Sequence, residues 1–278
     1  MTIIFISNIK RYIPPVQSAQ NQKSELLSFY KEMYRRTGEL IPQTGPNTGV
    51  APAAGGLSGS ELALKVLRQV IDSRTGELAG EPIYYLDVRS SEDFSAPAPD
   101  YYILSNFRFK HTKPLNIRGN AGISLIHAFM IMEYKLGNRK GEYAVGSVSQ
   151  RFEPSDYRGT GPILADGAIG FLLKAEAGSN EEGFYIEDYH ITREKEKFKQ
   201  LIGKEDYIVC HNNVETRSMA WESDFRTEFL SYDFGCMDTF CTLENLCARR
   251  MLKNGQTVTL VSVKNSNYTG IKLKYKEK

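Results

Sequence analysis

The chain has 278 residues, which is long enough for one large α/β domain or two smaller ones. Its 35 Lys and Arg nearly balance 33 Asp and Glu, so it lacks the basic excess of proteins that coat nucleic acid or anionic membranes. Apolar residues make up 41% and charged residues 24%, which excludes disorder of the whole chain. No apolar run approaches the roughly 20 residues of a membrane-spanning helix, and residues 1–6 lack a basic leader and a cleavage site. We therefore expect a cytoplasmic protein.

The first half of the chain alternates apolar segments of strand length with helical patterns. Ser58 and Glu61 have the spacing of a capping box, and the apolar residues that follow at intervals of three and four are typical of an amphipathic helix. This alternation indicates a parallel sheet covered on both faces by helices. The other predicted elements are a strand at 2–8 ended by Pro14 and Pro15, a polar helix at 24–36, loops at 41–60 and around Pro97 and Pro99, strands at 83–88, 143–149, 168–174 and 183–191, and a very apolar helix after Gly119.

The second half repeats this plan in a shorter form. Its predicted elements are a charged helix at 193–201, a short buried strand at 206–210, a helix at about 215–230, a helix marked by Phe240, Leu243, Cys247 and Met251, and strands at 257–263 and 270–275. No repeat is visible in the sequence itself, so the duplication is inferred from the order of the elements. We expect an α/β protein with an N-terminal half, 1–191, and a shortened C-terminal half, 192–278.

Cysteine and histidine spacing gives no support for a metal or cofactor site. The four cysteines, Cys210, Cys236, Cys241 and Cys247, include no C-x-x-C pair, and no two histidines have the spacing of metal ligands. The glycine-rich phosphate-binding loop and the G-x-S-x-G nucleophile motif are also missing. We therefore expect no metal and no cofactor, and buried reduced thiols at Cys241 and Cys247.

Two short stretches are candidates for a functional site. Residues 165–168, Ala-Asp-Gly-Ala, form a turn into an apolar strand, where glycine permits close approach of another backbone; an ordinary tight turn is the alternative. His211 follows an apolar strand and so lies at the carboxyl edge of a sheet, where α/β proteins bind ligands; a core histidine is the alternative. His111, His127 and His190 each stand alone, as surface or core histidines do.

The order of these pieces is similar to that of a known family. The opening strand followed by Tyr12-Ile13-Pro14-Pro15 resembles a first strand with a Y-x-P turn, and residues 116–136 resemble a helix that carries a nucleophilic cysteine. Residues 165–170 resemble a G-D-G-A-x-A turn, 206–214 resemble a histidine strand of the pattern D-x-V-x-P-H-Q-x-N, and 255–275 resemble the last two strands. Together they resemble the thiolase superfamily, and within it the ketoacyl-ACP synthase III branch.

This resemblance implies both a fold and a set of catalytic positions. The fold is a pair of βαβαβαββ halves in a layered α-β-α-β-α arrangement, truncated relative to full synthases. The family's cysteine, activated by a helix dipole, takes an acyl group, while a histidine and an asparagine stabilise the oxyanion. Here His211 keeps the histidine position, but Ala121 occupies that of the cysteine and Cys236 that of the asparagine. Alanine has no electron pair to attack a thioester, so no acyl-enzyme can form at position 121.

The departures from the pattern imply a non-catalytic subunit. Thiolase-like proteins associate through a continuous sheet, so an inactive copy can complete an active, cysteine-bearing one. By resemblance, the partner is a synthase-III-like acyltransferase in a heterodimer or heterotetramer that makes a fatty-acid-derived or polyketide secondary metabolite, with acyl carrier protein or acyl-CoA as the acyl donor. Two alternatives stay open: Cys236 is a relocated nucleophile with His211 as its base, or a homodimer uses His211 to decarboxylate a malonyl group.

Overall fold

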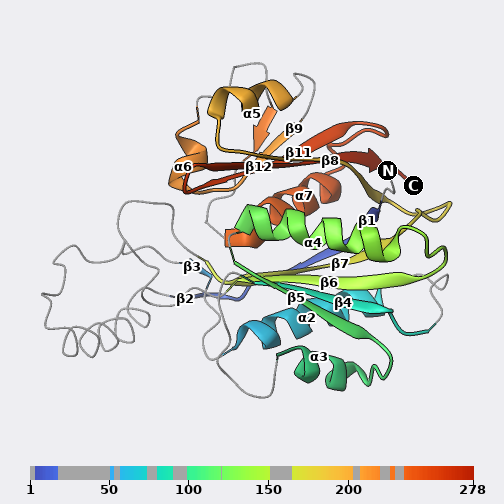
Figure 1. Ribbon diagram of the computed structural model, residues 1–278. Coiled ribbons are helices and arrows are strands. Elements are labelled where there is room, and N and C mark those ends of the chain that lie inside the picture. Colours follow the sequence, from blue (N-terminus) through green and yellow to red (C-terminus); the bar gives the residue numbers. More distant parts are fainter. Residues whose placement is uncertain are drawn as a thin grey trace, which may run out of the picture.

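The computed structural model describes residues 4–17, 51–52, 57–73, 80–89, 99–119, 121–150, 165–202, 207–219, 226–228 and 235–278. Within these ranges, layers of helices and strands alternate, with helices outermost on both sides and a central helix layer between two layers of strands (Figure 1). The helix predicted at 24–36 and most of the loop predicted at 41–60 lie outside the described residues.

The first set of elements follows the order expected from the resemblance. A separate two-stranded pair joins β2 (Val16–Gln17) to β3 (Ala51–Pro52). The main elements are β1 (Phe5–Tyr12), α2 (Gly59–Asp72), β4 (Tyr84–Arg89), α3 (Pro99–Phe107), β5 (Lys113–Arg118), α4 (Ala121–Leu136), β6 (Tyr143–Gln150) and β7 (Gly167–Lys174).

The second set is shorter in its helices but complete in its strands. Its elements are β8 (Gly183–Thr192), α5 (Lys195–Leu201), β9 (Tyr207–Cys210), α6 (Val214–Arg217), β10 (Arg226–Glu228), the 3-10 turn η2 (Gly235–Met237), α7 (Asp238–Ala248), β11 (Thr257–Lys264) and β12 (Asn267–Lys276).

Strand order shows the duplication that the sequence itself does not. The hydrogen-bonded order is β10-β9-β11-β12-β8-β1-β7-β6-β4-β5, so each set of five strands has the order third, second, fourth, fifth, first. In each set the fifth strand, β7 or β12, is antiparallel to both of its neighbours. The two sets join where β1 pairs with β8, which takes the first-strand position of the second set. The expected α/β fold with duplicated halves is confirmed, while the boundary at residues 191 and 192 stays a prediction.

The largest apolar core lies in the central helix layer. Helices α4 and α7 pack there between the two layers of strands, and α2 and α3 cover the outer face of the first layer (Figure 1). Phe129 of α4, Phe171 of β7 and Phe240 of α7 bring their ring centroids within 5.5 to 5.9 Å of one another. Most residues of α4 are apolar because the helix faces both layers of strands. No helix in the described ranges is long and apolar enough to cross a bilayer.

Local sequence signals set the start of the main helices. Ser58 Oγ accepts a hydrogen bond from the Glu61 amide at 3.2 Å, and Glu61 accepts one from the Ser58 amide at 2.7 Å, so the predicted capping box of α2 is confirmed. The turn into α4 needs Gly119, whose φ of 129° is unfavourable for residues with a side chain. The amphipathic helix and the apolar helix therefore begin where the sequence predicts.

Three elements differ from the sequence-based expectation. Pro99 begins α3 rather than a loop, because proline lacks only an amide that has no helical partner in the first turn. Strand β5, which has little apolar periodicity, was not expected. The helix predicted at about 215–230 is wrong at its end, because α6 ends at Arg217 and residues 226–228 form β10 beside β9. Tertiary pairing decides short segments of this kind.

A buried ionic cluster joins the carboxyl ends of β4 and β5. Asp87 is fully buried and lies 2.9 Å from Arg89 Nε, which is also buried, and 3.2 Å from Arg118 Nη2. Arg89 Nη1 donates to Ser60 Oγ at 2.9 Å, which ties the first turn of α2 to the sheet. The Asp87 carboxylate thus fixes the end of β5, three residues before α4 begins.

Replacing Asp87 by alanine should destabilise the fold strongly. Removing one partner of a buried ion pair leaves the other charge buried and costs about 3–5 kcal/mol. Urea unfolding followed by circular dichroism measures the change, and Glu142→Ala, which removes the exposed partner of Arg139, is the matched control with little effect. Equal midpoints for the two variants would contradict the structural role of the cluster.

Candidate active site

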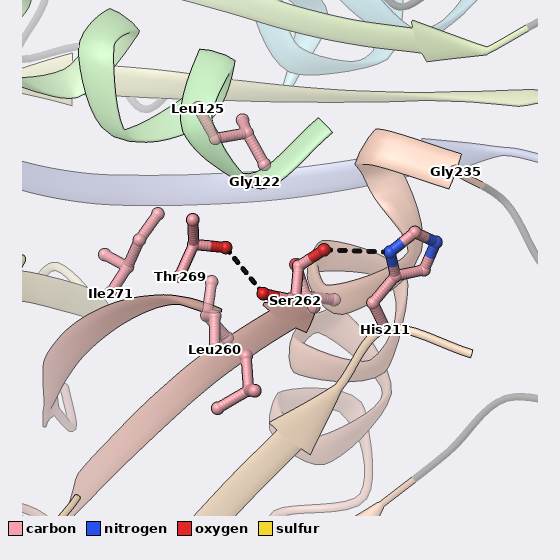
Figure 2. Close-up of a pocket in the computed structure, with 10 residues that line it drawn as sticks. Gly122, Leu125, His211, Gly235, Leu260, Ser262, Thr269 and Ile271 are labelled. Carbon is pink, nitrogen blue, oxygen red and sulfur yellow. Dashed lines mark hydrogen bonds between the residues drawn. The ribbon is translucent and has the colours of Figure 1, made fainter. Parts of the chain in front are cut away.

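The candidate site lies where β9, β11 and the start of α4 meet. His211 directly follows β9, and its amide donates to the Val261 carbonyl at 2.8 Å, so the backbone ladder with β11 continues into the site. The imidazole is buried, with 4% of its surface exposed. In Figure 2 it points toward Ser262 on one side and lies below Gly235 on the other.

A small cavity separates His211 from the beginning of α4. It is lined by Gly122 and Leu125 of α4, by His211, Gly235 and Thr239, and by residues of β11 and β12, namely Leu260, Val261, Ser262, Thr269 and Ile271 (Figure 2). Its volume is about 20 Å³. A single water needs roughly 10–15 Å³, so the cavity holds one small molecule of that size and no acyl chain.

The closeness of α4 to β11 and β12 explains the small volume. A Cβ atom placed on Gly122 would overlap Thr269 Oγ1 and would lie 3.0 Å from Ser262 Cβ. Thr269 is held in this position because its hydroxyl donates to the Ser262 carbonyl at 2.8 Å (Figure 2). Only glycine fits at position 122.

The hydrogen bonds around His211 fix its tautomer. Asn213 Nδ2 lies 3.1 Å from His211 Nδ1 and also donates to the Val263 carbonyl at 2.8 Å. The Asn213 amide cannot be flipped, because its oxygen accepts from the Thr216 amide at 2.7 Å. His211 Nδ1 therefore faces an N–H donor and must accept, and the Ser262 hydroxyl 3.0 Å away donates to the same nitrogen.

This tautomer defines what His211 can do chemically. With Nδ1 as the acceptor, the proton of the neutral ring is on Nε2. Nε2–H then donates a hydrogen bond and suits a carbonyl or oxyanion oxygen. In the same state Nε2 has no lone pair with which to take a proton from a thiol.

Of the three positions suggested by the resemblance, His211 lines the cavity, and the other two are chain neighbours of glycines that line it. Ala121 is the first residue of α4 and precedes Gly122, His211 lines the cavity, and Cys236 lies in η2 directly after Gly235. The side chains of Ala121 and Cys236 lie outside what the structure describes, so the pairing of Cys236 with His211 stays a prediction.

Cys210, which precedes His211 in the chain, packs in a separate apolar core and is not activated. Burial, together with the negative charge of Asp238, raises the pKa of Cys210 far above its ordinary value. Burial likewise raises the pKa of Cys247, to about 12. Thiols with raised pKa values stay protonated and are poor nucleophiles.

The second candidate stretch, residues 165–168, packs against η2, the turn that carries Gly235. A Cβ on Gly167 would lie 2.8 Å from Met237 Cε and 3.2 Å from the Tyr12 carbonyl, so glycine allows β7 to approach η2 and β1. Among the lone histidines, His111 and His127 are exposed and His190 is buried. In the described ranges, no three His, Cys, Asp or Glu residues gather as a metal site would require.

Sequence reasoning missed Gly122, Asn213, Ser262 and Thr269. Ser262 and Thr269 are paired across β11 and β12. A signal for Ser262 was available, because Val258, Leu260 and Ser262 alternate on one face of β11, and a hydroxyl in place of a third apolar side chain marks a special position. The role of Asn213 depends on contacts with residues about 50 positions away, which no local pattern shows.

Adding a methyl group at position 122 should destabilise the protein. Gly122→Ala forces α4 away from Thr269 and should cost about 1–3 kcal/mol, the usual penalty for overpacking. Thr269→Ala in the same chain should recover part of this loss, because it removes the hydroxyl that the new methyl overlaps. Urea unfolding of both single variants and the double variant gives the coupling. Additive effects would show that the two residues do not compete for space.

Nitrogen NMR should find the His211 proton on Nε2 at neutral pH. Asn213→Asp replaces the donor facing Nδ1 by a carboxylate, so the proton should move to Nδ1 or be held on both nitrogens. His111 and His127, which are exposed, serve as internal controls in the same spectra. A wild-type His211 protonated on Nδ1 would contradict the hydrogen-bond assignment.

No family model matches this chain, and no curated protein matches it either. Solved structures match nearly its whole length. ChlB3, described as an acyltransferase, is 18% identical with a TM-score of 0.70, over 99% of this chain and 98% of that one. A point variant of OleA from Xanthomonas campestris bound with cerulenin is 14% identical with a TM-score of 0.70, over 98% of this chain and 96% of the other. A second OleA variant is 13% identical with a TM-score of 0.68, over 98% of both chains.

At these identities the likeness establishes the fold. The matched spans run from end to end, so both sets of strands and helices take part in it. The chain therefore has the same fold as ChlB3 and OleA, which agrees with the fold that its sequence resemblance implied.

Proposed function

We propose that this protein is a non-catalytic, ketoacyl-synthase-III-like subunit that pairs with an active, cysteine-bearing condensing or acyltransferase subunit. The complex would act in the biosynthesis of fatty-acid-derived or polyketide secondary metabolites. The observation that carries the proposal is the narrow site that the described residues form at the start of α4. The helix begins with Ala121 instead of a thiol, and Thr269 fills the space beside Gly122.

The chemistry of the site agrees with this role. An acyl-transfer site needs a nucleophile and a volume that admits the acyl group. The cavity that the described residues line has about 20 Å³, which is smaller than an acyl chain or a thioester, and the protonated thiols of Cys210 and Cys247 do not line it. ChlB3, described as an acyltransferase, supports acyl transfer as the reaction class of the proposed complex.

One face of the fold is available for a partner. Strand β5 is last in the strand order, and no strand among the described residues covers its outer edge. Helix α4 packs over β4 and β5 and exposes apolar side chains, with 49% of Met130 and 86% of Tyr134 accessible. We call this the β5 face: the outer edge of β5 with Met130 and Tyr134. A free sheet edge, together with exposed apolar side chains on a helix that contacts the same strand, favours association with another sheet.

Acyl loading tests the proposal directly. The chain alone, incubated with acyl-CoA and analysed by intact mass spectrometry, should carry no adduct. Co-expressed with a cysteine-bearing synthase-III-like subunit, it should co-purify, and acyl groups should be found on that partner alone. An adduct on this chain that disappears in Cys236→Ala would overturn the proposal and support the alternative enzyme, in which Cys236 works with His211.

The β5 face should be needed for co-purification. Tyr134→Asp places a charge in the centre of the apolar contact and should weaken the complex at least about tenfold, as loss of a central aromatic anchor does. Leu201→Asp is the matched control, because Leu201 is an exposed apolar residue on the outer helix α5. Equal weakening by both variants, or by neither, would show that the partner does not bind at this face.

A further inference from the structure

The outer edge of β5 offers an incomplete set of hydrogen-bond donors. The Lys113 amide donates to the Ile83 carbonyl at 3.0 Å and the Gly119 amide to the Arg89 carbonyl at 3.3 Å, both on the β4 side. Because amides alternate in direction along a strand, the backbone groups of Pro114, Asn116 and Arg118 point away from β4. Proline has no amide hydrogen, so the edge presents donors at Asn116 and Arg118 and none at Pro114.

In a symmetric pair of β5 strands, the missing amide donor of Pro114 would occur twice. Two copies of β5 related by a two-fold axis run antiparallel, and each residue of one strand has its equivalent on the other. Each Pro114 then leaves one carbonyl of the opposite strand without its donor, so two hydrogen bonds are lost. A different strand with an ordinary residue in that place restores one of the two.

Charge also disfavours the pairing of β5 with a second copy of itself. Strand β5 contains Lys113 and Arg118 and no carboxylate of its own, and Arg118 is already paired with the buried Asp87. The Glu81 carboxylate accepts hydrogen bonds from the amides of Lys110 and His111 and also compensates the charge of Lys110, so Lys113 is the cation of the strand without a carboxylate partner among the described residues. A second copy of β5 offers Lys113 no carboxylate, whereas a strand with acidic side chains would neutralise it.

We infer that β5 selects against its own copy and accepts the edge strand of a non-identical subunit. The partner strand has an amide donor opposite the Pro114 region and Asp or Glu side chains near Lys113. This inference rests on the proposed function, because it specifies the chemistry of the partner at the β5 face. According to this inference, the backbone donors and the charge of β5 determine which partner binds, whereas the apolar side chains of α4 do not.

A variant that removes both obstacles should pair with itself. Pro114→Ala combined with Lys113→Glu restores two backbone donors in a symmetric dimer and places a carboxylate and Arg118 on each edge. Sedimentation of the full chain should show a homodimer more than about 25-fold tighter than that of the wild type, since each of the two restored hydrogen bonds contributes roughly fivefold and the carboxylate adds to this. Pro114→Ala combined with Lys253→Glu is the matched control, with the same net charge but the acidic residue on an exposed loop. This control should gain only the increase in dimer affinity that comes from the two restored amide donors.

Hydrogen exchange locates the contact and separates this inference from the proposed function. In the self-pairing variant the amides of Asn116 and Arg118 should become protected, whereas in the wild type alone they should exchange freely. A wild-type homodimer that protects these two amides overturns the inference. A heterocomplex in which they still exchange freely overturns it too, while leaving the pairing proposal intact. If no cysteine-bearing partner binds at all, the proposed function fails, and the self-association assay on the chain alone still decides what β5 selects.

Discussion

Helix α4 meets the second half of the chain at a contact with no space for one methyl group. The hydroxyl of Thr269 occupies the position where a side chain on Gly122 would begin, and the Ser262 carbonyl holds that hydroxyl in place. Protein interiors are packed closely enough that such a contact fixes the distance between the elements that share it. The separation of α4 from β11 and β12, the size of the cavity and the place of His211 all depend on this contact.

The same contact limits the chemistry of the site. His211 is oriented by Asn213 and Ser262 and presents a hydrogen-bond donor, but the space in front of the ring is about that of one water. A histidine that is held in one tautomer can donate a hydrogen bond into its cavity, but the residues that the structure describes there include no thiol for it to activate. The buried hydrogen bonds of His211 also stabilise the end of β9, so they have a structural reason to exist apart from any reaction.

The buried carboxylate of Asp87 links this site to the surface proposed for a partner. It holds Arg118 at the end of β5, and β5 both forms the sheet edge and leads into α4. A subunit docked on β5 would therefore contact the strand that positions the first turn of α4. The site and the open edge are thus connected through one strand, β5, and the helix that follows it.

The sequence alone determined the elements that follow from local patterns. Apolar periodicity predicted α4, β6, β7, β11 and β12, the Ser58–Glu61 spacing predicted the start of α2, and the order of the motifs resembled that of a family whose fold agrees with the observed one. Tertiary structure decided the rest. Strand β10 exists because β9 offers it a partner, and Gly122, Asn213, Ser262 and Thr269 meet His211 through contacts that mostly join positions far apart in the chain. Periodicity records which face of an element is buried, whereas the distance between two such faces is set only when all layers pack together.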